Sequence, residues 1–292
     1  MNIKKLAAID IGSNAMRLLI NYVYEFEDSE PVFNKTALVR MPVRLGKDVF
    51  TSNKISNHSM KRMIKAMKSF RLMMDIYGID AYLAYATSAM RDSENGREVI
   101  KKIKEEAKIK IIDGETEARL IFASELKKFV VDENSYLFVD VGGGSTELTL
   151  MNNGHIGISK SFPVGTVRLM ENKVAENTYS EMKKWIEDNI RPTEVELIGS
   201  GGNINHVYKY SGIKLGRPMP ASYVRKHYKI VRNMEYSERL REFNMKTDRA
   251  DVIEFALEIY VKVMKWSKAQ KIHVPKIGIS DGMIRSLYEQ KK

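Results

Sequence analysis

One pattern occurs twice in this chain and restricts its fold more than any other feature. An apolar strand ends at an aspartate, a glycine turn follows, and two further strands lead into a helix. The first copy is centred on DIGSN at residues 10–14, and the second on DVGGGSTE at residues 140–147. A duplication with one such turn in each half is stronger evidence than either turn alone. The repeat predicts an α/β fold built from two similar halves.

Hydrophobic periodicity predicts the elements around these turns. In the first half we expect two strands within 6–24, strands at 31–43, 81–86 and 109–112, and helices at 55–77, 97–108 and 115–129. In the second half we expect strands at 136–141, 146–151, 155–162 and 196–198, a strand near 277, and helices at 180–190, 248–266 and from 281. Thr178 and Glu181 have the spacing of a capping box for the helix at 180–190.

Composition excludes several classes of function. The chain has no cysteine, and its five histidines are scattered, which argues against disulfides, thiolate zinc sites and histidine metal clusters. It has no apolar run long enough for a transmembrane helix and no signal-peptide pattern, so we expect a cytoplasmic protein without membrane contact. The net charge of +11 favours polyanionic partners, and residues 208–232 carry seven Lys or Arg and no Asp or Glu. No nucleic-acid-binding motif is present, so we do not expect a nucleic-acid partner.

The second turn has the chemistry of a phosphate site. Three consecutive glycines expose backbone N–H groups and let an anion approach without interference from a Cβ atom. Ser145 and Thr146 add hydroxyl groups. Asp140 and Glu147 place two carboxylates beside this turn, which is reasonable if a divalent cation neutralises them. The predicted phosphate-binding residues of the turn are Gly142, Gly143, Gly144, Ser145 and Thr146.

Three further segments are candidates for the site. The first turn offers Gly12, Ser13 and Asn14 for phosphate and Asp10 for a metal, as the opposite jaw of one phosphate clamp. The Ser/Thr-rich turn at 87–95 contains Arg91, which suits a phosphoryl oxygen, although simple helix capping explains the same residues. The acids at 115–117 begin a helix, where they ordinarily complement the helix dipole.

Seven segments follow one another along the chain: DIGSN, ATSAMRDSEN, DGETEARLIF, FVDVGGGSTEL, SFPVGTVRL, DRADVI and GISDGMIRSL. In order and spacing these motifs resemble the Ppx/GppA family of phosphatases, and the match spans roughly residues 6 to 290. The resemblance departs at Thr116, where the family usually has a second glutamate, and at 200–205, where a Gly-Thr ending is more usual. The chain stops where longer members continue into an HD-type domain, so it resembles a short form of the family.

The resemblance implies a fold of two RNase H-like domains, as in actin, Hsp70 and sugar kinases, with a phosphate-binding cleft between them. We expect the first domain at 1–123, completed by a helix at 280–292, and the second at 124–279. The resemblance also implies that Glu117 is the catalytic base and that Asp140 and Glu147, with Asp10, hold Mg²⁺, or Mn²⁺ in its place. Arg91 is the expected clamp on the terminal phosphate, and a homodimer is implied.

The expected function is exopolyphosphatase activity, with inorganic polyphosphate as the substrate and residues 208–232 as a track for the rest of its chain. Guanosine pentaphosphate (pppGpp) is the alternative substrate, because it also ends in a phosphoanhydride. An actin-like ATP-binding module that acts by conformational change would share both turns. A non-catalytic nucleotide or polyphosphate sensor would not need Glu117, Asp140 and Glu147 together.

Overall fold

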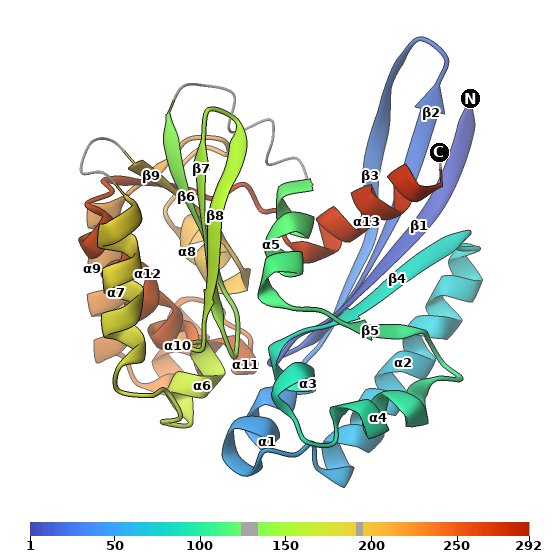
Figure 1. The fold of residues 1–292 in the computed structure, drawn as a ribbon, viewed down its shortest axis with the longest axis horizontal. Helices are drawn as coiled ribbons and strands as arrows, with labels where there is room; N and C mark the ends of the chain where they lie inside the picture. The colour runs from blue at the N-terminus through green and yellow to red at the C-terminus, as the bar shows by residue number, and fades with distance from the viewer. Residues whose placement is uncertain (124–133, 191–194, 292) are drawn as a thin grey trace. The chain divides into compact units, whose positions relative to one another are not determined.

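A computed structural model describes residues 1–123, 134–190 and 195–291. The chain divides into two compact units (Figure 1). Unit 1 consists of Met1–Ser124 with Gly278–Lys292, and unit 2 consists of Glu125–Ile277. The sequence predicts these divisions after residue 123 and before residue 280. Each unit has its own sheet and its own packed helices, so the two are described separately.

Unit 1 is built on a five-stranded sheet with the order β3-β2-β1-β4-β5. β1, β2 and β3 form an antiparallel meander, while β4 runs parallel to β1 and β5 runs parallel to β4. The central residues of β1 and β2 are almost wholly apolar and buried, as expected for strands covered on both faces. The strands are β1 (Asn2–Ile11), β2 (Met16–Phe26), β3 (Ser29–Met41), β4 (Ala81–Ala86) and β5 (Ile109–Ile111).

The helices of unit 1 include one from the far end of the chain. α13 (Ile279–Gln290) packs against β1, β2, β4 and α5 (Gly114–Ala123), as Figure 1 shows. Gly282 allows this packing, because a Cβ atom there would lie 1.6 Å from the carbonyl oxygen of Leu120 on α5. The remaining helices are α1 (Leu45–Ser52), α2 (Asn57–Tyr77), α3 (Ser88–Asp92) and α4 (Gly96–Ile103).

Unit 2 is built on a six-stranded sheet with the order β10-β11-β9-β6-β7-β8. β6, β7 and β8 form an antiparallel meander, and β9 and β11 continue the sheet in parallel from β6. The strands are β6 (Ser135–Val141), β7 (Thr146–Asn152), β8 (His155–Phe162), β9 (Val195–Ser200), β10 (Met219–Pro220) and β11 (Lys271–His273).

The central helix of unit 2 is α12 (Ile253–Ser267), which packs against α6, α7, α8, α9 and β6. Tyr260 on this helix is fully buried, and its hydroxyl hydrogen-bonds the carbonyl oxygens of Val139 and Ser200 at 3.1 and 2.6 Å. The other helices are α6 (Thr166–Met170), α7 (Thr178–Asn189), α8 (Gly202–Tyr210), α9 (Ala221–Asn233), α10 (Tyr236–Glu242) and α11 (Thr247–Ala250). No described helix of either unit is both long enough and apolar enough to span a bilayer.

The duplication predicted from the sequence is confirmed by the topology. The order β8-β7-β6-β9-β11 in unit 2 repeats β3-β2-β1-β4-β5 in unit 1, and corresponding neighbours run in the same relative directions. Asp10 and Asp140 therefore occupy the same place, one residue before the end of the first strand. The two glycine turns follow at equivalent positions.

Two predictions for unit 2 were wrong for local reasons. The strand expected near Ile277 does not form, because pairing with β9 ends at His273, Pro275 has no N–H, and Lys276 has a positive φ of 57°. The capping box of Thr178 and Glu181 is also absent, because Asn177 occupies the N-cap position and its amide donates to Glu181 Oε1 at 2.7 Å.

Helix lengths also differ from the predictions. The helix expected at 248–266 is broken at Asp251 and Val252, which separate α11 from α12. Beside the break Asp248 is buried, and Arg249 Nη1 lies 3.4 Å from His206 Nδ1. The helix expected at 97–108 ends at Ile103. The helix expected at 115–129 is described as far as Ala123, and its remainder lies outside the described residues.

Candidate active site

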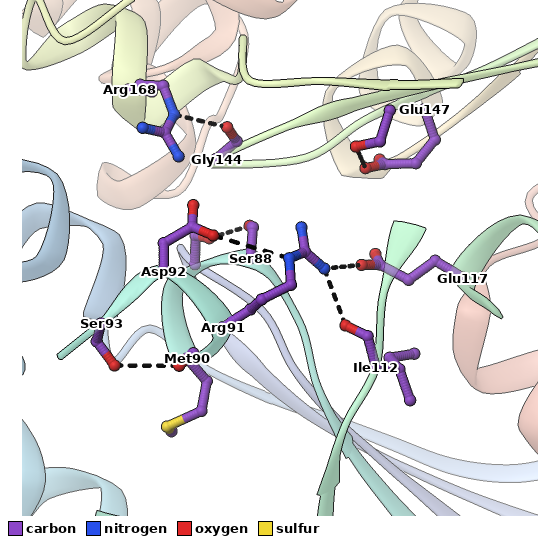
Figure 2. Close-up of polar contacts among 12 residues, drawn as sticks. Ser88, Met90, Arg91, Asp92, Ser93, Ile112, Glu117, Gly144, Glu147 and Arg168 are labelled. Atoms are coloured by element: carbon purple, nitrogen blue, oxygen red, sulfur yellow. Dashed lines mark hydrogen bonds and ion pairs between the residues drawn. The ribbon is translucent and has the colours of Figure 1, made fainter. Parts of the chain in front are cut away.

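Arg91 and Glu117 meet in unit 1 (Figure 2). Arg91 lies on α3, directly after β4, and Glu117 lies on α5, which follows β5. Because β4 and β5 are parallel neighbours, their carboxyl ends bring these helices together. Arg91 Nη1 is 3.2 Å from Glu117 Oε1 and also donates to the Ile112 carbonyl oxygen at 2.9 Å. Glu117 is only 7% exposed, so its carboxylate is held in a partly dehydrated position.

The start of α5 fixes the direction of Glu117. Asp113 precedes the helix, and its Oδ1 accepts a hydrogen bond from the backbone N–H of Thr116 at 2.8 Å. The N–H of Glu117 in turn donates to the Asp113 carbonyl oxygen at 3.0 Å. The hydrogen bonds from Thr116 hold the pKa of Asp113 below its usual value. Asp113 therefore acts as an N-cap, while Glu117 is held by Arg91.

The first glycine turn is closed by a hydrogen bond from Gly12 N to the Ala15 carbonyl oxygen at 3.1 Å. Ser13 and Ser88 are both buried, and their hydroxyl oxygens are 2.8 Å apart. This contact joins the turn at 10–14 to the segment that carries Arg91. Two motifs that lie far apart in the sequence, DIGSN and ATSAMRDSEN, are thus brought together within unit 1.

Asp10 is paired with Arg17 across β1 and β2. The two residues are register partners, and Arg17 Nη1 lies 3.0 Å from Asp10 Oδ2. Burial of the Asp10 carboxyl raises its pKa, and the charge and hydrogen bond of Arg17 offset this only in part. A buried carboxylate that is costly to ionise is typical of a functional position rather than a stabilising one.

In unit 2 the equivalent pair consists of two acids. Asp140 on β6 faces Glu147 on β7, at the positions that Asp10 and Arg17 occupy in unit 1. Like charges directly opposite each other in a sheet are destabilising. Glu147 is 3% exposed, and Ser161 on β8 donates its hydroxyl hydrogen to Glu147 Oε1 at 2.9 Å. This donor set fits a hard divalent cation, which would offset the repulsion.

The described chain nowhere gathers three or more His, Cys, Asp or Glu side chains into a group that could hold a metal ion. The candidate ligands are Asp140 and Glu147 within unit 2, and Asp10 within unit 1. Mg²⁺ commonly takes one or two carboxylates and completes its octahedron with water and substrate phosphates. Asp140 and Glu147 are sufficient for that kind of coordination.

The second glycine turn lies between these two carboxylates in the sequence. Gly142 N donates to the Ser145 carbonyl oxygen at 3.0 Å, as Gly12 does to Ala15 in the first turn. Ser145 is 6% exposed. Thr146 is fully buried, and its hydroxyl donates to the Val164 carbonyl oxygen at 2.6 Å. The Thr146 hydroxyl group is thus used in a hydrogen bond to the segment that follows β8.

Two residues for which the sequence predicted no role contact the predicted site. Ser161 holds Glu147, and Arg168 Nε donates to the Gly144 carbonyl oxygen at 2.9 Å (Figure 2). Both lie in or beside the motif SFPVGTVRL, so the signal was present without an assigned role. Four of the seven basic residues in 208–232 lie on α9, where Arg225, Lys226, Lys229 and Arg232 are exposed.

Several known proteins are similar to this chain in sequence. The family model described as the Ppx/GppA phosphatase family matches residues 30–291. A bifunctional 3-dehydroquinate synthase/phosphatase from Fusobacterium nucleatum is 37% identical over 216 residues, which are 67% of this chain and 32% of that protein. Exopolyphosphatase 1 of Mycobacterium tuberculosis is 24% identical over 204 residues, which are 68% of this chain and 58% of that protein. The matched region therefore covers between about a third and rather more than half of the length of these two relatives.

Solved structures share the fold over the whole chain. An exopolyphosphatase from Cytophaga hutchinsonii superposes with a TM-score of 0.82 at 24% identity and covers 98% of both chains. The Ppx/GppA family member of Aquifex aeolicus gives a TM-score of 0.79 at 22% identity, with 100% of this chain and 99% of that chain covered. With the family model matched over residues 30–291, this chain belongs to the Ppx/GppA phosphatase family.

Proposed function

We propose that this protein is an exopolyphosphatase that hydrolyses the terminal phosphoanhydride of inorganic polyphosphate. The observation that carries the proposal is the pair formed by Arg91 and Glu117, at 3.2 Å, in a member of a phosphatase family. A buried glutamate held by a guanidinium at the start of a helix is suited to orient and deprotonate water. The names of the mycobacterial and Cytophaga relatives support the choice of substrate.

Catalysis of phosphoryl transfer depends mainly on positioning and on electrostatic stabilisation. In the proposed reaction Glu117 takes a proton from water as it attacks the terminal phosphorus. The bridging oxygen leaves with the shortened chain. The glycine turns at 12–14 and 142–145 supply backbone N–H groups for the phosphate oxygens. Arg91, besides holding Glu117, places positive charge beside the reacting phosphate.

Mg²⁺ is proposed as the cofactor, with Mn²⁺ as the alternative. Asp140 and Glu147 would hold it, with Asp10 as the candidate from unit 1. The ion, when bound, would withdraw negative charge from the terminal phosphate. Ser161 fixes the Glu147 carboxylate through its hydroxyl group at 2.9 Å, and such outer contacts orient metal ligands.

The guanosine nucleotide pppGpp is the alternative substrate, because the same residues would act on its terminal phosphoanhydride. The net charge of +11 and the exposed basic face of α9 favour a longer polyanion. We also propose a homodimer, on the resemblance to the family alone. An ATP-dependent module that works by conformational change is the candidate from another class.

The experiment that tests the proposal is phosphate release in the presence of Mg²⁺, with long-chain polyphosphate, pppGpp and ATP at equal concentration. Release from polyphosphate that disappears in Glu117→Gln supports the exopolyphosphatase. Release from pppGpp alone keeps the mechanism and changes the substrate. Preferred hydrolysis of ATP, or no release from any of the three, refutes the proposal.

A further inference from the structure

A short segment after β8 hydrogen-bonds the carbonyl groups of the second glycine turn. The backing segment, residues 164–168, begins two residues after β8 and includes the first turn of α6. Its backbone N–H groups at residues 166–168 all donate into the turn. Thr166 N donates to the Gly142 carbonyl oxygen at 3.0 Å, and the next two N–H groups donate to the Gly143 carbonyl oxygen at 2.8 and 3.1 Å. Gly165 permits this approach, because a Cβ atom there would lie 2.6 Å from Gly143 and Gly144 backbone atoms.

The third carbonyl group of the turn is held by a side chain. Arg168 Nε donates to the Gly144 carbonyl oxygen at 2.9 Å, and Figure 2 shows the guanidinium beside the turn. Three consecutive carbonyl groups, at 142, 143 and 144, therefore accept hydrogen bonds from the backing segment. The donors to the first two are backbone N–H groups, and only the Gly144 carbonyl group accepts its hydrogen bond from a side chain.

This arrangement determines where the N–H groups of the turn point. In a planar trans peptide the N–H group points away from the carbonyl group of the same unit. With the carbonyl groups of 142–144 turned toward the backing segment, the N–H groups of Gly143, Gly144 and Ser145 are directed away from it. Among the described residues no acceptor is hydrogen-bonded to these three N–H groups. Successive N–H groups of this kind form an anion-binding nest.

The same device occurs independently in unit 1. After β3, the backbone N–H of Arg44 donates to the Asn14 carbonyl oxygen at 3.0 Å, and Gly46 N donates to the Ser13 carbonyl oxygen at 2.7 Å. Gly46 again has no room for a Cβ atom, which would lie 3.0 Å from Ser13 Cβ. The carbonyl groups at 13 and 14 correspond to those at 143 and 144. The Arg168 side chain thus does in unit 2 what a backbone N–H group does in unit 1.

We propose that Arg168 is a positioning residue for the terminal phosphate. Its guanidinium fixes the peptide between Gly144 and Ser145, so that the Ser145 N–H group faces the phosphate oxygen. The inference rests on the proposed function for the identity of the anion. Loss of the guanidinium lets this peptide rotate, and the nest then loses one of its three donors.

Three substitutions test the role of Arg168. Arg168→Met removes the donor, Arg168→Gln keeps a neutral amide that can reach the carbonyl group, and Arg168→Lys keeps the charge. Lys183→Met is the matched control, because it removes one positive charge from an exposed position on α7 in the same unit. The readouts are the Kd for inorganic phosphate by calorimetry, KM and kcat on polyphosphate, and the thermal unfolding temperature.

We expect Arg168→Met to raise the phosphate Kd and the KM about tenfold, the effect of one lost charge-assisted hydrogen bond, while the unfolding temperature of the variant stays close to wild type. Arg168→Gln and Arg168→Lys should recover part of the affinity. An unchanged Kd in Arg168→Met, or an equal loss in Lys183→Met, overturns the inference. If Arg168→Met does not fold, Arg168→Gln and Arg168→Lys are compared with wild type instead, and an unchanged phosphate Kd in both overturns the inference. Absent hydrolysis in wild type would refute the proposed function instead, since phosphate binding is measured without turnover.

Discussion

Arg91 holds Glu117 through one nitrogen, with Nη1 3.2 Å from Glu117 Oε1. The same nitrogen donates to the Ile112 carbonyl oxygen, so the guanidinium is anchored to the chain just before α5 as well as to the carboxylate on that helix. The carboxylate is therefore oriented both by its helix and by a cation that is itself fixed. This rigidity suits Glu117 to the proposed role of general base, because the attacking water would have to be held in line with the leaving group.

Replacing Glu117 with glutamine should lower kcat on polyphosphate by about 10²- to 10⁴-fold and leave substrate binding largely unchanged. The amide keeps the shape and can still contact Arg91, but it cannot accept a proton. Glu115→Gln is the control, since this residue lies two positions earlier on α5 with its side chain 72% exposed. Steady-state rates and equilibrium binding of polyphosphate check the prediction, and near-normal turnover in Glu117→Gln would contradict it.

Ser161 offers a test of the proposed metal site that does not alter a proposed ligand. Ser161→Ala removes the hydrogen bond to Glu147 Oε1, so the carboxylate loses its fixed orientation. We expect the Mg²⁺ concentration for half-maximal activity to rise about tenfold, with little change in the rate at saturating Mg²⁺. Ser159→Ala is the matched control, because Ser159 lies on the same strand and bonds Thr149 at 2.9 Å instead. Equal Mg²⁺ requirements in both variants would argue against Glu147 as a ligand.

The repeat at Asp10 and Asp140 was predictable because it depends on local pattern. Alternating apolar residues, a glycine turn and the strand that follows are written in contiguous sequence, and the register of each hairpin then follows from the turn length. The opposition of Asp140 and Glu147 across β6 and β7 is a direct consequence. Local sequence pattern alone therefore predicts the positions of both glycine turns.

Other parts of the structure depend on contacts that local pattern does not contain. Arg168 reaches the turn at Gly144 from 24 residues away, and the motif SFPVGTVRL that contains it does not show which group its guanidinium contacts. The helical pattern over 248–266 is continuous, yet the structure divides it into α11 and α12, and Arg249 beside the break contacts His206 of another helix. Tertiary contacts of this kind determine where a helix ends and which side chains support the site. They form only when the elements are packed together.

Gly282 tests whether α13 completes unit 1 in solution. A Cβ atom at this position would lie 1.6 Å from the Leu120 carbonyl oxygen, which is backbone and cannot move aside alone. We expect Gly282→Ala to lower the free energy of unfolding by about 3 kcal/mol, measured by urea denaturation. Gly278→Ala is the control, since a Cβ there meets nothing within 4 Å and its φ of −148° suits any residue. Equal stability of the two variants would contradict the packing of α13 on α5.

The buried histidines of unit 2 predict a dependence of stability on pH. Burial lowers the pKa of His206 to about 4, with the nearby charges of Arg249 and His227 acting in the same direction. Burial also lowers the pKa of His227. The unfolded chain then binds more protons than the folded one between pH 6.5 and 4, so stability should fall as the pH falls through this range.

Unfolding temperatures between pH 7 and pH 4 check this expectation. His206→Gln places a side chain there that stays neutral at every pH. The variant should show a weaker dependence of the unfolding temperature on pH, because the proton that His206 takes up on unfolding is no longer involved. His155→Gln is the control, since His155 is exposed on β8. A slope that both variants share with wild type would show that other groups, such as the carboxylates, account for the acid sensitivity.

Asp10 should show opposite effects on stability and on activity. Burial raises the pKa of this carboxyl, so its ionised form costs free energy in the folded state at neutral pH. Asp10→Asn keeps the shape, removes that cost, and leaves Arg17 partly exposed, where water can solvate it. We expect Asp10→Asn to unfold at the same or a higher temperature at pH 7, with activity at least about tenfold lower. Because the pKa is raised, any stabilisation should disappear as the pH falls below 3.8, where Asp10 is protonated in both states. A variant that unfolds at a lower temperature at pH 7 would instead make the pair with Arg17 a structural ion pair, and would remove Asp10 from the proposed metal site.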